Sequence, residues 1–225
     1  MKIDELIDRL QRLPEGGIMT SENRYDYEYC VSVWNTYRAF FIQETYAKNK
    51  RINPICYQKY HPTYDKDFQD NNGCYAKFYC PNVISLDDKS DGLRYVGTDP
   101  VKVGQSMAFK RIQSRAWLSS YNNHAVTNVN NTRNVYYLLD GQMQTIELYG
   151  NGTFIKVPPL VEGLFADPTA IPTWNKDFDP YPIDDDSVPE IEEMIYTAHT
   201  RIVEGTSPTP AFTPSYQPKP APRRK

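Results

Sequence analysis

The chain has 225 residues, which is enough for one or two domains with a sizeable hydrophobic core. Its 25 Lys and Arg residues and 28 Asp and Glu residues give a net charge of -3, so it lacks the basic excess typical of nucleic-acid-binding domains. No stretch approaches the roughly 18 apolar residues of a membrane-spanning helix, and the first residues are not typical of a signal or transit peptide. We therefore expect a protein that stays in the cytoplasm in which it is made, with its four cysteines reduced.

Two residue types are over-represented and point to partners. The chain has 18 tyrosines, whose rings tolerate water at one stage and burial against a partner at another. It also has 18 prolines, of which 13 lie from Pro158 onward, so the last third should consist of turns and extended segments around one helix. This composition is more typical of a binding or assembly protein than of a compact enzyme.

Hydrophobic periodicity predicts three helices, at residues 3–13, 26–50 and 187–203. The first is short and amphipathic. The third has a strong start, because Ser187 and Glu190 have the spacing of a capping box and Pro189 lies in the first turn. We interpret the three aspartates at 184–186 as negative charges that favour this helix start, since they do not follow the pattern of a calcium-binding loop.

The helix at 26–50 has two apolar stripes and should need two neighbouring layers. One stripe is predicted to face the core, against the helix at 187–203, and consists of Tyr27, Cys30, Val31, Trp34, Tyr37 and Phe41. The other consists of Tyr29, Val33 and Phe40 and lies on a different side. We expect this second stripe to contact another part of the chain or another subunit.

The middle of the chain carries the β signals. Residues 51–81 show no clear periodicity and receive no assignment, whereas 82–86 and 93–97 resemble short strands. Residues 105–120 fit a short helix and an edge strand equally well. The clearest pattern runs from 135 to 157, where a tight Asp140-Gly141 turn with positive φ and a second turn at 150–152 predict a three-stranded antiparallel meander.

These elements predict an α+β fold with a helical layer and an antiparallel β-meander. Residues 1–205 would form one adaptor domain. Residues 206–225 contain six prolines, four basic residues and no acidic residue, so they cannot form a core and should extend as a polyproline-like arm. We expect the arm to become ordered only on a neighbouring molecule.

Residue patterns that would indicate chemistry are weak. Cys56, His61, Cys74 and Cys80 follow a loose zinc-ligand order without the usual close pairs, so buried thiols are the preferred interpretation and a zinc site remains the alternative. We find no phosphate-binding loop, nucleophile elbow or metalloprotease motif. The sequence therefore predicts no enzyme, no catalytic residue and no cofactor.

Four short stretches resemble a family of virion structural proteins. They are residues 34–40 (WNTYRAF), 136–141 (YYLLDG), 163–168 (GLFADP) and 181–183 (YPI). Together they resemble the head–tail connector, or neck ring, proteins of crAss-like short-tailed bacteriophages. The resemblance spans roughly residues 25 to 203.

The resemblance implies a subunit repeated as a ring around the DNA exit channel, joining the capsid portal to the tail. Its partners would be copies of itself, the portal protein and adjacent neck or tail proteins, with genomic DNA passing without sequence-specific binding and with no membrane contact. It would be made in the host cytoplasm and reside in the virion. Interface candidates are Tyr29, Val33, Phe40, Phe212, Tyr216, Arg223 and Arg224.

Two other functions stay open on the sequence alone. One is a tail-tube or other tail component, which only its position in the particle would separate from a neck ring. The other is a small intracellular zinc-binding regulatory module, which would carry stoichiometric metal and lose structure with a chelator.

Overall fold

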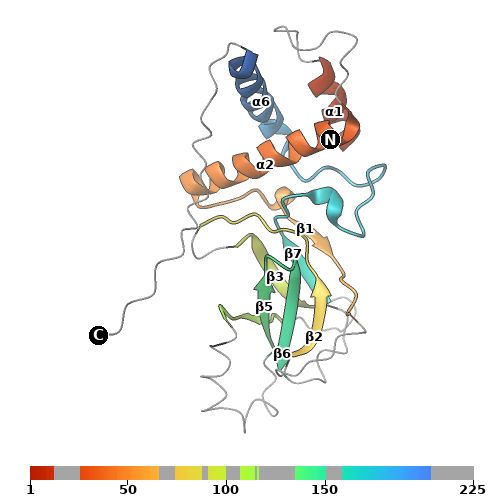
Figure 1. The fold of residues 1–225 in the computed structure, drawn as a ribbon, viewed down its shortest axis with the longest axis vertical. Coiled ribbons are helices and arrows are strands. Elements are labelled where there is room, and N and C mark those ends of the chain that lie inside the picture. Colours follow the sequence, from red (N-terminus) through yellow and green to blue (C-terminus); the bar gives the residue numbers. More distant parts are fainter. Residues whose placement is uncertain are drawn as a thin grey trace, which may run out of the picture.

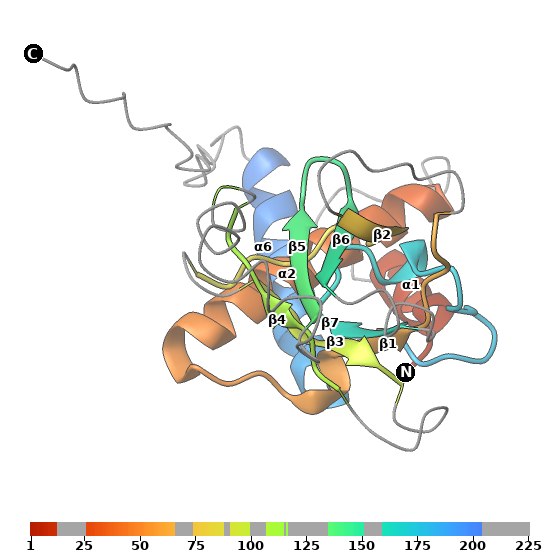
Figure 2. The same ribbon diagram turned by 90° about the horizontal axis from the view of Figure 1, so that it is seen from below.

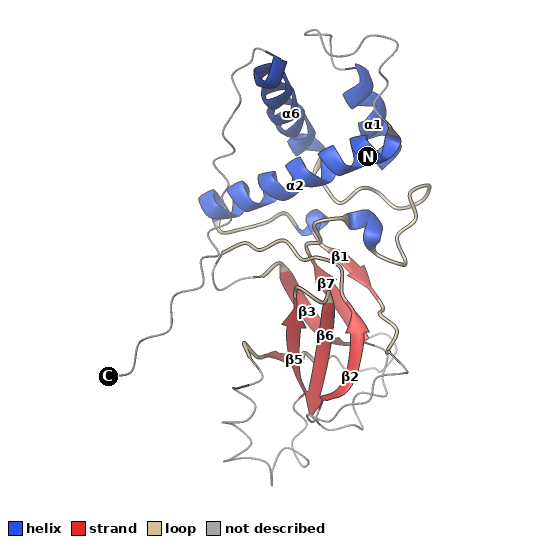
Figure 3. Ribbon diagram, viewed as in Figure 1, coloured by secondary structure: helices blue, strands red, loops and turns tan. Residues whose placement is uncertain are grey.

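A computed structural model describes residues 1–12, 26–65, 74–87, 91–99, 107–114, 116, 135–150 and 159–203. It has a helical layer stacked on a layer of two small β-sheets (Figures 1 and 3). The long helix α2 lies between them, with α1 and α6 on one side and the strands on the other (Figure 1). The predicted α+β fold class is confirmed.

The helices begin and end close to the predicted residues. They are α1 at Ile3–Arg12, α2 at Tyr27–Asn49 and α6 at Val188–Val203. Helix α2 ends because Lys50 takes a left-handed conformation (φ 54°) and its N–H bonds the carbonyl of Tyr46 at 2.8 Å. Of the helices in the described ranges, none combines the length and apolar character that crossing a membrane requires.

The helical layer has its own apolar core. As predicted, α2 packs against α6, and α1 covers both. The Trp34 indole N–H donates to the carbonyl of Leu6 at 3.0 Å, and Arg9 forms a two-point ion pair with Glu192. The buried members of this core include Ile3, Leu6, Ile7, Leu10, Cys30, Trp34, Ile191 and Ile195.

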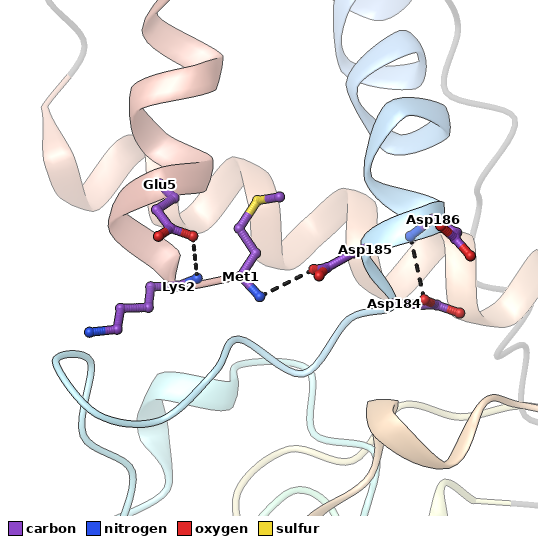
Figure 4. Close-up of polar contacts among 6 residues, drawn as sticks. All are labelled: Met1, Lys2, Glu5, Asp184, Asp185 and Asp186. Atoms are coloured by element: carbon purple, nitrogen blue, oxygen red, sulfur yellow. Dashed lines mark hydrogen bonds and ion pairs between the residues drawn. The ribbon is translucent and has the colours of Figure 1, made fainter.

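The aspartates at 184–186 lie at the start of α6, as the sequence predicts (Figure 4). Asp185 and Asp186 belong to the short 3-10 turn η3 (Asp185–Ser187), and the Asp184 carboxylate caps this turn by accepting from the Asp186 N–H. Asp185 pairs with the amino group of Met1 at 3.1 Å. The positive end of the helix dipole and the amino group of Met1 therefore stabilise the negative charge at this helix end.

The β layer consists of two sheets. The first has the order β1-β7-β3, and the second has the order β2-β6-β5-β4. All neighbours pair antiparallel except β4 and β5, which are parallel. The strands are β1 Gln58–Tyr60, β2 Cys74–Tyr79, β3 Leu93–Thr98, β4 Lys110–Arg111, β5 Val135–Asp140, β6 Thr145–Gly150 and β7 Pro159–Gly163.

The two sheets face each other across one core and are joined at both edges. Tyr64 bridges to Phe78 at one edge, and Gly97 bridges to Ala108 at the other. Figure 2 shows the strands of both sheets around this centre. The buried residues of the core include Tyr60, Phe78, Val96, Val135, Tyr137, Ile146, Leu148, Val161 and Phe165.

The hairpin at β5 and β6 confirms the strongest β prediction, but two details differ. The turn has four residues, 141–144, and its positive φ is at Gln144 (50°) rather than at Gly141, because the Asp140 carboxylate caps the N–H groups of Gln142 and Met143. The third predicted strand, at 153–157, lies outside the described residues. Strand β2 occupies the edge of β6 where a meander would add that strand.

Other parts of the middle region were unassigned or open in the sequence. Residues 51–81 contain β1 and β2, whereas the predicted strand at 82–86 makes only single bridges, from Val83 and Ser85. Of the stretch 105–120, the described part contributes β4, an edge strand of the second sheet. The edge-strand alternative is therefore correct for residues 110–111, whereas Ala116 is helical.

We predict that Gly97→Ala destabilises the β layer. A Cβ at this position would lie 2.4 Å from the Met107 carbonyl oxygen and 2.5 Å from the Tyr95 hydroxyl. We expect a loss of about 1–3 kcal/mol in the free energy of unfolding, measured by urea denaturation. Gly141→Ala is the matched control, because nothing lies within 4 Å of its added Cβ, and its effect should stay within about 0.5 kcal/mol. Equal effects of the two substitutions would contradict the close approach at Gly97.

We also predict a loss of stability in alkali. Burial raises the pKa of Tyr137 to about 12 and also raises the pKa of Tyr60 and Tyr181. Because unfolded tyrosines release their protons near pH 10, the stability that these phenols contribute is present below about pH 10 and declines as the pH rises further, and the part contributed by Tyr137 is lost by about pH 12. Urea denaturation across this range should show the decline, and Tyr137→Phe should make it shallower. Tyr196→Phe, which changes an exposed tyrosine, should leave the decline with pH as it is in the natural protein. Equal slopes for the two variants would contradict the assignment of the decline to the buried tyrosines.

Candidate interaction surface

Arg38 joins the two layers of the protein. Its side chain is 0 % exposed, at the centre of the α2 surface that faces the β layer. Its Nε–H donates to the carbonyl of Pro182 at 2.8 Å, Nη1 to that of Phe165 at 2.8 Å, and Nη2 to that of Cys56 at 3.2 Å. One guanidinium thus holds the connection between α2 and β1 and two points of the connection between β7 and α6.

The charge of Arg38 is balanced by dipoles and by nearby electron-rich groups. Burial lowers its pKa, whereas Tyr181 and Asp167 act in the opposite direction. The guanidinium carbon lies 5.6 Å from the centre of the Tyr181 ring. Arginine suits this position because it stays charged and offers five N–H donors in a fixed fork.

A chain of side-chain hydrogen bonds continues from this junction to the surface. The Tyr181 hydroxyl donates to Asn35 Oδ1 at 2.7 Å, and Asn35 Nδ2 donates to Asp167 Oδ1 at 2.9 Å. The same carboxylate caps the 3-10 turn η2 (Pro168–Ala170) through Thr169. The segment that follows Asp167 is therefore fixed relative to α2.

A groove of about 870 Å³ lies between α2 and this segment. Its aromatic lining comes from Tyr27, Tyr79 and Trp174, and amide side chains of Asn82, Gln144 and Asn175 lie around it. Aromatic rings with a few polar groups are the usual lining of sites that bind peptides and small molecules. The groove is the candidate interaction surface.

Trp174 connects the groove to the interior. Its partly buried ring packs against both the helical core and the β core. Among the described residues its buried indole N–H has no hydrogen-bond partner. Such a donor costs about 1–3 kcal/mol of desolvation free energy when it is left unpaired.

The predicted interface residues are only partly placed. Tyr29 and Phe40 are both exposed on α2, and Val33 is half-buried against the helical core. They do not line the groove. Phe212, Tyr216, Arg223 and Arg224 lie outside the described residues.

The predicted core stripe of α2 was wrong in part. Tyr27 is exposed, while the buried residues of α2 are Cys30, Trp34, Asn35, Arg38 and Ile42. The reason is that α2 is covered on two sides, by α1 and α6 over Trp34, and by the 3-10 turn η1 (Pro54–Cys56) and loops around Ile42. The expectation that α2 contacts two layers is met, but the second contact is not made through the stripe of Tyr29, Val33 and Phe40.

The candidate zinc ligands are in separate surroundings where the structure describes them. Cys56 and Cys80 are buried in different apolar clusters, and burial raises the pKa of both thiols, that of Cys80 to about 12. His61 lies near the surface, 3.6 Å from Asp99. The side chain of Cys74 lies outside the described residues, and the described ones contain no group of three or more potential metal ligands.

Sequence reasoning missed Arg38 and the groove. An arginine in a helix is normally assigned to solvent, and only its place among apolar residues at 34–40 could have suggested burial. A scan against protein-family models found no match to this chain, and neither did a search of the curated proteins.

We predict that Arg38→Met weakens the packing of the helical layer on the β layer and lowers the stability of the protein. Methionine fills much of the space but leaves three backbone carbonyls unpaired, so we expect a loss of about 3 kcal/mol or more in urea denaturation. Arg9→Met removes the more exposed ion pair to Glu192 and should cost about 1 kcal/mol or less. The Arg38 junction would be refuted as a major stabilising contact if both variants lost the same small amount.

Proposed function

We propose that this protein is a structural subunit of a phage head–tail connector, assembling as a ring between the portal and the tail. The observation that carries the proposal is the convergence of three stretches that resemble the connector family. Residues 34–40, 163–168 and 181–183 meet at Arg38, Asn35, Asp167 and Tyr181. A buried junction of this kind suits a subunit that must keep one shape.

The exposed aromatic residues support repeated contacts between copies. Tyr29 and Phe40 lie on α2, and Tyr196 lies on α6, so both long helices offer apolar rings to solvent. A ring subunit contacts its two neighbours through two different surfaces, and aromatic residues are enriched in such interfaces. This arrangement supports heterologous assembly.

The test is quantitative peptide mass spectrometry on purified particles from the source culture, normalised to the portal subunit. We expect about one copy per portal subunit, as for a ring that continues the portal symmetry. Absence from particles would overturn the proposal. A copy number that follows the tail proteins instead would assign the chain to the tail.

We predict that Tyr29→Lys with Phe40→Lys blocks incorporation into particles. Two charges in an apolar contact would have to be desolvated, whereas the folded subunit can keep them in solvent. The measurement is the same particle ratio, with circular dichroism to verify folding. Met143→Lys is the control, since this exposed side chain lies at the tip of the β5–β6 hairpin. Normal incorporation of the double variant would exclude this stripe as an essential contact.

A further inference from the structure

The groove beside α2 has the surface chemistry of a site for a proline-rich peptide. Tyr27 and Tyr79 are 40 % and 43 % exposed, so two rings of the lining are open to solvent. Proline-rich segments bind in grooves lined by aromatic residues, because flat rings pack on the proline faces and nearby donors bond the exposed carbonyls. Asn82, Gln144 and Asn175 supply amide groups around these rings.

This chain contains such a segment in its sequence. Residues 206–225 have six prolines, together with Phe212 and Tyr216. Proline restricts the backbone before binding, so little conformational entropy is lost when the segment docks. An extended polyproline form of 20 residues would reach about 60 Å.

The charges of the two surfaces are complementary. Residues 206–225 carry Lys219, Arg223, Arg224 and Lys225 and no acid. At the α2 start, Tyr27 donates a hydrogen bond to Asp4 at 2.9 Å. Burial, this bond and the charges of Asp4 and Asp177 raise the pKa of Tyr27 to about 12.

Further acidic groups lie at the same end of the groove. Asp26 precedes α2, and Glu28 lines the groove directly. The opposing charges among the described residues are Lys176, over the ring of Tyr27 at 5.3 Å, and Lys2, which donates to the carbonyl of Asp177. The described carboxylates outnumber these two ammonium groups at this end, which favours a basic peptide terminus there.

We propose that the groove formed by Tyr27, Tyr79 and Trp174 binds the proline-rich arm, residues 206–225, of a second copy of this chain. The proposal deepens the proposed function and rests on it, because it names the contact by which one ring subunit holds the next. The arm supplies proline and aromatic faces to the tyrosines and basic residues to the acidic end. The indole N–H of Trp174, which has no partner among the described residues, is a donor that a carbonyl of the arm would satisfy.

The direction of α6 favours the arm of another copy. The helix rises from α2 on the side opposite the strands, and its C-terminal end is the part farthest from them (Figure 1). Its 16 residues span about 24 Å, so Val203, the last described residue, lies well away from the groove of its own subunit.

The test is photo-crosslinking in the full-length chain. Unlabelled protein carrying Phe212→p-benzoylphenylalanine is mixed at about 1 mM with isotope-labelled protein that has the natural residue, at a concentration above the dissociation constants of most weak contacts. The expected product joins an unlabelled arm to labelled peptides that contain Tyr79 or Trp174. Mass spectrometry separates it from adducts within one chain.

Two matched variants of the labelled partner make the result specific. Tyr79→Ala should raise the protein concentration that gives half-maximal adduct by about tenfold, as for an interface residue worth about 1.4 kcal/mol. Ile55→Ala removes an apolar side chain of comparable exposure (50 %) that lies outside the groove, and should change this concentration by less than about twofold. Circular dichroism verifies that both variants are folded.

Each result has a defined meaning. Adducts to the groove of the labelled copy that depend on Tyr79 support the proposal. Adducts within one chain, adducts elsewhere, no adduct, or equal effects of the two variants overturn it. If groove adducts form but the protein is absent from particles, the arm contact holds and the connector role is refuted. If particles contain about one copy per portal subunit but no groove adduct forms, the connector role holds and the arm contact is refuted.

Discussion

The structure depends on a positive charge placed where water cannot reach it. Removing the Arg38 guanidinium from water is costly, and the protein offsets that cost with carbonyls of Cys56, Phe165 and Pro182. Cys56 lies in the connection between α2 and β1, and Phe165 and Pro182 lie near the two ends of the connection between β7 and α6. Because the charge is stabilised only when both connections are in place, the two layers have one preferred arrangement rather than a range of them.

This constraint extends to the surface through short polar links. Asn35 and Asp167 couple the junction to the segment that carries Trp174, so the width of the groove is set by contacts in the interior. A site that is shaped before its ligand arrives loses less free energy on binding than one that must be ordered. The proposed arm contact would thus combine a groove of fixed shape with a segment whose backbone is already restricted by its prolines.

Much of the fold was predictable because it follows local periodicity. The three helices and the β5–β6 hairpin have strong patterns; the helix bounds agree with the structure to within a residue, whereas β6 begins at Thr145, three residues after the expected start. Strands β1 and β2 were not predictable, since each owes its position to a partner far along the chain, β7 or β6. The candidate site was missed for the same reason: Tyr27, Tyr79 and Trp174 become neighbours only after the layers pack. The high tyrosine content predicted partner surfaces only in part, because Tyr60, Tyr137 and Tyr181 are buried in the core while other tyrosines are exposed.

The joined edges of the two sheets affect how copies of this protein can associate at high local concentration. An open sheet edge presents a row of unpaired backbone groups, and identical molecules held side by side can pair through such rows and aggregate. The bridges from Tyr64 to Phe78 and from Gly97 to Ala108 use up backbone groups at both seams of the described β layer. Copies crowded together would then find it hard to associate through strands. Side-chain surfaces and extended segments would remain as the means of recognition, and these can be matched to one neighbour more selectively than a bare backbone can.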